Sequence, residues 1–370
     1  MIDNTMLLQE LFSKNQIALE NTPFLKTCPA SMPADWDFER VEGMLLGLAV
    51  GDALGYTTEA MLPERRARLY GEIRYYLPSP FADQLPVGTP SDDTQMAFWT
   101  LEKALVDGGL VPDHLAFEFT QHELYGIGAT VRDFIREYKD KGKPWQEAGQ
   151  PSAGNGVVMR IAPVLIPHLR QPSPALWADA AIAGMITHND RASNACSIAF
   201  VHLLWECLHL QQIPDSTWWI NTFTDAASQL EGTTYYRSRL TEYPYTGTHW
   251  QFIDREVRQA LAENWPVLSA CERWHSGAYL LETMPCVLYI LARCGHDPDE
   301  AIVRAVNDTK DNDTVAAIVG AAVGALHGKR GLPERWVNNL LGRTEAADDG
   351  RVFELIAEAR KVFWDENASF

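Results

Sequence analysis

The sequence predicts an all-α protein, a compact multi-helix bundle with a single domain. Apolar residues recur at the three- and four-residue spacing of a helix face along most of the chain. Alternating strand patterns are scarce, and the best strand candidate is the short segment 73–77 (IRYYL). Hydrophobic residues make up 46% of the 370 residues, which is enough to bury a large core.

Residues 1–37 differ from the rest and are predicted to form an N-terminal extension before a helical domain at 38–370. The stretch MLLQELF indicates a short amphipathic helix, and Pro23, Pro29 and Pro33 then interrupt regular structure. The N-terminus has no basic segment before a long apolar one, so we do not expect a secretory signal. Two interpretations of the extension stay open: it packs on the body, or it reaches a partner protein.

Two apolar helices carry stripes of small residues at every fourth position. The stripes are Gly43, Gly47, Gly51 and Gly55 in the first helix, and Ala316, Gly320, Gly324 and Gly328 in the second. Glycine costs about 1 kcal/mol per helix position relative to alanine, so a stripe of glycines needs a structural reason. We expect the two helices to pack backbone to backbone at the centre of the bundle.

Helical periodicity also runs through the rest of the body. The further segments that it marks are 94–109, 114–126, 174–188, 191–210, 255–265, 278–294 and 299–307. Residues 214–249 are rich in aromatic residues and threonine, and we expect a less regular insertion there. No internal repeat, low-complexity tract or clear linker divides the chain, which supports a single domain.

The net charge of −18 argues against a basic nucleic-acid-binding face and against an anionic membrane surface as a partner. A cationic protein or a bound metal ion fits this charge better. No uncharged apolar run reaches the length that crosses a bilayer. The six cysteines have no metal-binding spacing and lie mostly in apolar helical segments, so we predict buried, reduced thiols and a cytoplasmic location.

Acidic residues crowd at the start of two helices that lie far apart in the sequence. The segments are Ser91-Asp92-Asp93-Thr94 and Asp311-Asn312-Asp313-Thr314. Helix capping is the ordinary explanation, but a cap requires only one such side chain. Together the two helix starts would gather four carboxylates, which repel one another unless cations neutralise them. Hard oxygen ligands select Mg²⁺, Mn²⁺ or Ca²⁺, and the positions do not fit an EF-hand loop.

Other polar positions have both a structural and a functional interpretation. Asp52 lies within an apolar helix, where we expect it to hold a neighbouring helix end or loop. Glu59 follows that helix, at a transition where functional groups often lie. The tight loop at 154–156 can offer backbone N–H groups to an anion, although an ordinary turn explains it as well. His188 and Tyr279 are each more typical of structural residues when taken alone.

The order of these motifs resembles the ADP-ribosylglycohydrolases over about residues 41–328. The motifs are GMLLGLAVGDALGYTTE, SDDT, GNGVVMRIAP, THND, SGAYLLETMPCVLY and DNDTVAAIVGAAVGA. The resemblance implies a compact all-α fold with a binuclear Mg²⁺ centre, in which Mn²⁺ is possible. The metal ligands that it implies are Ser91, Asp92, Asp93, Asp311, Asp313 and Thr314, with Ser91 standing where the family usually has threonine.

The resemblance also implies an activity and the residues that carry it. Glu59 and Asp93 would be the catalytic carboxylates, whereas Gly154, Asn155, Gly156, His188 and Tyr279 would contact ADP-ribose. The implied reaction is hydrolysis of the N-glycosidic bond of ADP-ribosylated arginine on proteins, which can serve as immunity against an ADP-ribosyltransferase toxin. Hydrolysis of serine-linked ADP-ribose, toxin occlusion by residues 1–37 and a catalytically silent relative remain as alternatives.

Overall fold

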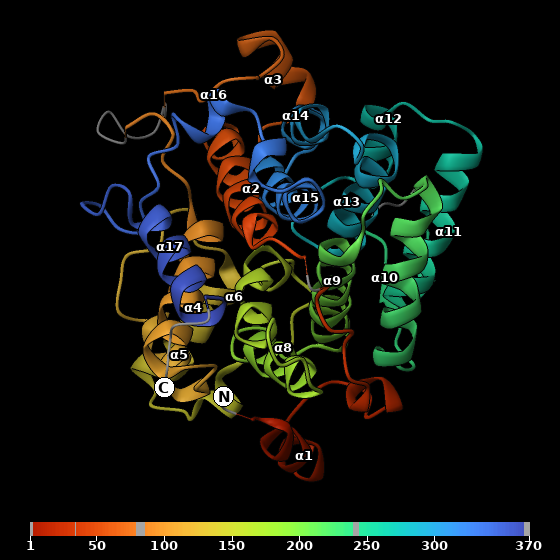
Figure 1. The fold of residues 1–370 in the computed structure, drawn as a ribbon. Helices are drawn as coiled ribbons and strands as arrows, with labels where there is room; N and C mark the ends of the chain where they lie inside the picture. The colour runs from red at the N-terminus through yellow and green to blue at the C-terminus, as the bar shows by residue number, and fades with distance from the viewer. Residues whose placement is uncertain (1–2, 34, 79–85, 240–243, 366–370) are drawn as a thin grey trace.

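The computed structural model describes residues 3–33, 35–78, 86–239 and 244–365, and these form one body of packed helices (Figure 1). The prediction of an all-α fold is confirmed, since the strands of the described residues are two short ones, β1 (Tyr236–Arg237) and β2 (Thr246–Gly247). The α-helices are α1 (Thr5–Ser13), α2 (Glu39–Gly55), α3 (Pro63–Tyr70), α4 (Asp92–Asp107), α5 (Pro112–Glu118), α6 (Ala129–Ile135), α7 (Trp145–Ala148), α8 (Ala175–Met185), α9 (Arg191–His209), α10 (Ser216–Leu230), α11 (His249–Ala262), α12 (Val267–Arg273), α13 (Leu280–Cys294), α14 (Pro298–Asp308), α15 (Asn312–His327), α16 (Glu334–Val337) and α17 (Arg351–Phe363).

Helices α2 and α15 lie side by side at the centre of the molecule (Figure 1). A side-chain carbon added at Gly47 would overlap the carbonyl oxygen of Gly320, and one added at Gly320 would overlap that of Gly47. Gly51 meets the backbone of Ala316 in the same way. The predicted backbone-to-backbone packing is therefore confirmed. It accounts for the stripes, because a β-carbon at these positions would force the two helices apart.

The other helices surround this central pair and bury both of its members. Helices α9, α13 and α14 pack against α15, whereas α4 contacts both α2 and α15. Every residue of α15 except its last, His327, is buried, as is nearly all of α2 after its first turn. The N-terminal ends of α4 and α15 are therefore fixed by the core of the protein, and both ends carry the acidic residues.

The structure corrects three expectations about local structure. Segment 73–77 is irregular and not a strand, because the side chain of Asn307 forms hydrogen bonds with the N–H and the carbonyl of Ile73 in place of a partner strand. The helix predicted at 114–126 ends at Glu118 and continues as turns. Within 214–249 a regular helix, α10, begins after the capping carboxylate of Asp215, and the short strands β1 and β2 follow it, while residues 240–243 lie outside the described residues.

The N-terminal extension packs on the body, which is the first of the two interpretations. Helix α1 lies against α8, and its Leu8 and Leu11 are buried. The Asn4 side chain donates a hydrogen bond of 2.7 Å to the buried Asp179 carboxylate. Farther along, the indole of Trp177 donates to the carbonyl of Thr27. Apolar burial and buried hydrogen bonds thus hold the extension in place.

The structure agrees with the predicted burial of most of the cysteines. All six cysteines are free thiols, and four of them are buried, whereas Cys28 is exposed and Cys294 is half-buried. Burial raises the pKa of the Cys196 thiol, so this group stays protonated.

Among the helices of the described residues, none combines the length and the apolar character that crossing a bilayer requires.

Candidate metal centre and active site

A cavity of about 410 Å³ lies where the starts of α4 and α15 meet the end of α2. The acidic residues that line it are Glu59, Asp92, Asp93, Asp311 and Asp313. The remaining described lining residues with polar side chains are Thr130, Ser152, Asn155, His188, Arg239, Tyr279 and Thr314. The two acidic helix starts are therefore brought together as the sequence predicts, and the loop at 154–156 lies beside them.

The start of α4 is capped by a residue from another helix. Both carboxylate oxygens of Asp52, in α2, accept hydrogen bonds of 2.9 Å from the backbone N–H of Ser91. Asp52 also accepts from the N–H of Thr94 at 3.0 Å and from both hydroxyls. The capping role is thus filled by Asp52, as expected for a residue that holds a helix end. The carboxylates of Asp92 and Asp93 are therefore not needed to cap α4, and they remain available to bind a cation.

The start of α15 is fixed by its contacts with the end of α2. The Asn312 side chain donates hydrogen bonds to the carbonyl of Gly55 at 3.1 Å and to the hydroxyl of Thr58 at 2.9 Å. A side-chain carbon on Gly55 would overlap the backbone of Asp313, so the last glycine of the stripe lets α15 approach at this point. The glycine stripe therefore sets the position of Asp313 relative to Asp52.

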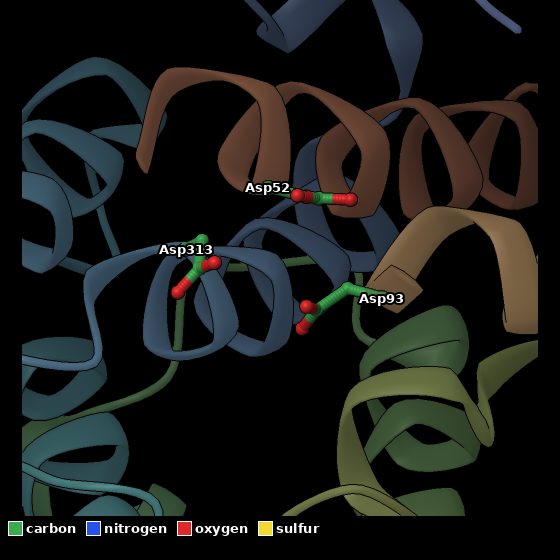
Figure 2. A group of neighbouring side chains, drawn as sticks. All are labelled: Asp52, Asp93 and Asp313. Carbon is green, nitrogen blue, oxygen red and sulfur yellow. The ribbon is translucent and has the colours of Figure 1, made fainter. Parts of the chain in front are cut away.

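Five carboxylates form two overlapping groups around Asp313. Oxygen atoms of Asp52, Asp93 and Asp313 lie within 4.8 Å of one another, and the three side chains converge from three helices (Figure 2). Oxygen atoms of Glu59, Asp311 and Asp313 form a second such group. Both groups offer oxygen ligands from rigid helix ends, which is the donor chemistry that hard divalent cations prefer.

The hydrogen bonding of Asp93 leaves one oxygen without a partner. Its Oδ2 accepts from the hydroxyl of Ser91 at 3.1 Å and from that of Thr314 at 3.4 Å. Its Oδ1 is buried and accepts no hydrogen bond from the protein. A buried carboxylate oxygen without a donor is costly, and a cation beside it removes that cost. The residues present therefore fit a divalent metal centre.

Crowding and burial perturb the acid–base behaviour of these groups. Burial, and then the neighbouring carboxylates, raise the pKa of Asp92, Asp93 and Asp313 well above the usual range. Burial raises the pKa of Asp311 to about 6, against a hydrogen bond from Asn155. Glu59 is open to the cavity, yet lost hydration and the charges of Asp311 and Asp52 raise its pKa to about 7. Without a cation, this cluster holds protons near neutral pH.

The loop at 154–156 is held by hydrogen bonds to neighbouring segments and to the acidic cluster. The N–H of Gly154 donates to the hydroxyl of Ser152 at 3.3 Å, and the N–H of Asn155 donates to the carbonyl of Ala278 at 3.0 Å. The side chain of Asn155 donates a hydrogen bond of 2.6 Å to Asp311. Two of the loop's N–H groups are thus used within the protein, and its amide positions a predicted metal ligand.

His188 and the loop glycines form one wall of the cavity. The imidazole lies against Gly154 and Gly156, where a side-chain carbon would crowd the ring. The Nδ1 atom lies 2.9 Å from the hydroxyl of Thr187. Burial, with the charge of Arg160, lowers the pKa of His188 to about 3, so the ring is neutral. Tyr279 lies next to this wall, because its backbone pairs with that of Gly154.

The structure places Asp52 and Ser91 outside the cavity lining. Ser91 is fully buried, and its hydroxyl lies between Asp52 and Asp93. Asp308, a further carboxylate three residues before Asp311, is also outside the lining and pairs with Arg304 at 3.3 Å. Burial raises the pKa of Asp308 to about 6 against this attraction.

Sequence reasoning missed two features of the site. Asp52 belongs to the acidic cluster as well as capping α4, and its position inside an apolar helix was the available signal. Arg239 lines the cavity, but nothing in the local sequence distinguishes it from other surface arginines. Its place follows only from the fold of the β1–β2 region over Tyr279.

Comparison with known proteins adds independent evidence. The family model described as ADP-ribosylglycohydrolase matches residues 32–363. An uncharacterised protein of Archaeoglobus fulgidus is 30% identical over 82% of this chain and 92% of its own length. The "ADP-ribosylarginine hydrolase Tri1" of Pseudomonas putida is 27% identical, over 86% of this chain and 78% of that protein.

Two further similarities extend over most of the chain. The "ADP-ribosyl-[dinitrogen reductase] glycohydrolase" of Rhodospirillum rubrum is 26% identical, over 87% of this chain and 97% of its own. A solved structure titled "ADP-ribosylglycohydrolase-related protein complex" superposes with a TM-score of 0.65 and 27% identity, over 88% of this chain and 97% of that one. Together with the acidic cavity, these findings show that the chain belongs to the ADP-ribosylglycohydrolase family and is a hydrolytic enzyme of that family.

Proposed function

We propose that this enzyme hydrolyses the N-glycosidic bond between ADP-ribose and an arginine side chain of a protein, with the help of Mg²⁺. The observation that carries the proposal is the pair of carboxylate groups that share Asp313, since four of their five members line one cavity. Relatives named as ADP-ribosylarginine hydrolases from Pseudomonas putida and Serratia proteamaculans support arginine as the linkage. Two Mg²⁺ ions fit the two groups, and Mn²⁺ has the same ligand preferences.

The residues that would hold the cations are the four aspartates of the two helix starts, with Ser91 and Thr314 as hydroxyl ligands and Asp52 and Glu59 at the edges of the cluster. Bound cations would orient the hydroxyls of the distal ribose and acidify a water molecule. Asn155 keeps Asp311 oriented, and Asp52 keeps the start of α4 in place. These fixed positions reduce the reorganisation that the reaction requires.

The protein's own groups have distinct proposed parts in the bond cleavage. As the bond from the anomeric carbon to the guanidinium breaks, its electron pair stays on nitrogen, which leaves as a neutral guanidine, and nearby carboxylates stabilise the positive charge that builds at the carbon. Glu59 is open to the cavity, so it can take the proton of the attacking water and pass it to the departing guanidine. Asp93 is more enclosed and already bonded through one oxygen, so we assign it to metal binding first and to electrostatic stabilisation second.

Release of ADP-ribose from ADP-ribosylated arginine and serine proteins, with and without Mg²⁺, tests the proposal. We expect metal-dependent release from the arginine substrate and a loss of at least about 100-fold in the Asp93→Ala variant, since a metal centre supplies several kcal/mol of transition-state stabilisation. Asp225→Asn is a control on the exposed surface and should retain activity. Equal rates without metal, or an unimpaired Asp93→Ala variant, would contradict the proposal. Preferential release from serine would replace the proposed linkage.

A role in immunity against an ADP-ribosyltransferase toxin follows if the enzyme reverses the toxin's modification. Several apolar side chains of the N-terminal extension, among them Leu8, Leu11 and Leu25, are buried on the body, which favours protection by hydrolysis over occlusion through residues 1–37. Co-expression with an arginine-specific ADP-ribosyltransferase tests this role. Protection should disappear in the Asp93→Ala variant if hydrolysis is responsible, and it should persist if occlusion is.

A further inference from the structure

The charge of the cavity conflicts with the charge of the proposed substrate. Five carboxylates line the cavity, whereas the ADP-ribosyl group carries negative charge on its diphosphate. Cations bound to the acidic cluster would offset the repulsion near the distal ribose. The diphosphate lies in another part of the ligand, which those cations do not neutralise. A separate positive group is expected wherever the diphosphate rests, because burying an unpaired anion is costly.

The backbone of the 154–156 loop supplies fewer donors than its sequence suggests. The N–H groups of Gly154 and Asn155 already donate to Ser152 and Ala278. His188, on the same wall, is neutral because burial lowers its pKa to about 3. Neither these N–H groups nor the neutral ring supplies a positive charge, so a charged partner for the diphosphate has to come from another part of the lining.

Arg239 is the one cationic side chain among the described residues that line the cavity. Its guanidinium lies over the ring of Tyr279, with its central carbon 4.7 Å from the ring centroid. Stacking of this kind restricts a guanidinium without using its N–H donors, which remain directed around its edge. The side chain is 61% exposed, so the donors are accessible to a ligand in the cavity.

Glu282 is a second neighbour of this guanidinium. The Nε atom of Arg239 is 3.6 Å from Oε1 of Glu282, which is an ion pair too long for a hydrogen bond. Glu282 is buried, and neither of its oxygens accepts a well-formed hydrogen bond. This loose pairing holds Arg239 at the cavity wall while leaving the terminal N–H groups unengaged by the carboxylate.

From this geometry we propose that Arg239 binds the diphosphate of the ADP-ribosyl group, with Tyr279 and Glu282 as the residues that position it. The planar guanidinium matches phosphate oxygens in pairs, and charge-assisted hydrogen bonds of this kind are among the stronger polar contacts. The inference rests on the proposed function, because it takes ADP-ribose as the ligand. It adds a substrate-binding residue that lies outside the metal centre and the 154–156 loop.

Calorimetric titration of ADP-ribose into the Mg²⁺-loaded protein at low and high salt tests the proposal. The variant Arg239→Met removes the charge and keeps the length of the side chain. We expect it to weaken ADP-ribose binding about tenfold or more and to flatten the salt dependence of Kd. Arg239→Lys keeps the charge and should recover part of both effects. Arg237→Met, two residues earlier, is the matched control, since Arg237 is exposed and outside the cavity lining.

The outcomes distinguish a failure of this inference alone from a failure of the proposed function. If the parent protein does not bind ADP-ribose, the proposed function fails, and this inference fails with it. If the parent binds and Arg239→Met binds equally well, only the role of Arg239 is overturned. If Arg239→Met weakens binding but the salt dependence is unchanged, Arg239 acts by packing on Tyr279, and its assignment to the diphosphate is wrong. Melting temperatures of all variants exclude loss of folding as the cause.

Discussion

The carboxylate of Asp52 accepts hydrogen bonds from both the backbone N–H and the hydroxyl of Ser91, at 2.9 and 2.7 Å. Asp52 lies in α2 and Ser91 immediately precedes α4, so the core helix α2 directly fixes the start of α4. The same carboxylate lies within the acidic cluster around Asp313. One buried side chain therefore joins the stability of the fold to the geometry of the candidate metal centre.

The first prediction concerns this joint role. Asp52→Asn should lower the free energy of unfolding by at least about 2 kcal/mol, because an amide nitrogen would face the donors of Ser91 and Thr94 and the charge-assisted hydrogen bonds would be lost. Mg²⁺ affinity should fall at the same time. Urea unfolding and calorimetry measure the two effects. Asp215→Asn is the control at an exposed helix cap and should change stability by only a few tenths of a kcal/mol, since asparagine also caps well.

The second prediction concerns the glycine stripe. Gly47→Ala should destabilise the protein by about 3 kcal/mol or more, although alanine is the better helix former, because the added carbon overlaps the backbone of Gly320. Gly128→Ala, where a side-chain carbon meets open space, should cost less than about 1 kcal/mol. The midpoints of denaturant-induced unfolding of the two variants measure these changes in stability. A stabilised Gly47→Ala variant would show that the helices can separate freely.

The third prediction is that Mg²⁺ affinity falls as the pH is lowered from about 8 to about 6. The pKa of Glu59 is raised to about 7 and that of Asp311 to about 6, so protons compete with the cation in this range. Binding should therefore release protons, which calorimetry detects as a dependence of the heat on the buffer. In the Glu59→Gln variant, the change of Mg²⁺ affinity with pH should be smaller at the upper end of this pH range. Affinity that does not vary with pH would contradict the raised pKa values.

The fourth prediction concerns removal of the metal. The pKa values of Glu59 and Asp311 are raised above those of the unfolded chain, so their contribution to stability is full below about pH 4 and is lost as the pH rises from there through about 6 to 7. The chelated protein should thus become less stable over that range. Mg²⁺ should restore its melting temperature, most strongly at the higher pH, because it binds only the folded state. Melting curves with chelator and with Mg²⁺ measure the difference, and equal curves at all pH values would contradict it.

The fifth prediction concerns the N-terminal extension. Leu11→Ala should cost about 2–4 kcal/mol, because the side chain is buried between the extension and the body. Met6→Ala is the matched control in the same helix, where the side chain is 83% exposed, and it should be close to neutral. Deletion of residues 1–37 should likewise lower the melting temperature. A deletion that leaves stability unchanged but abolishes binding of a partner would support a docking role instead.

Residue patterns within single segments predict much of the fold and of the acidic site. Helical periodicity gives the all-α fold, and the two stripes give the central helix pair, because each depends on residue spacing within one segment. The repeated acidic helix starts likewise predict one cation-binding cleft. Where local patterns are ambiguous, as at segment 73–77 and after Glu118, the expectations fail because tertiary hydrogen bonds decide the backbone.

The sequence by itself determined the class of fold, the family and the acidic residues of the site. Only the tertiary structure decided that Asp52 caps α4, that Asn155 supports Asp311, and that Arg239 reaches the cavity over Tyr279. The physical reason is the range of the interactions. Helix formation and small-residue stripes depend on neighbours a few positions apart, whereas each of these contacts joins residues about forty or more positions apart, which come together only when the whole core has packed.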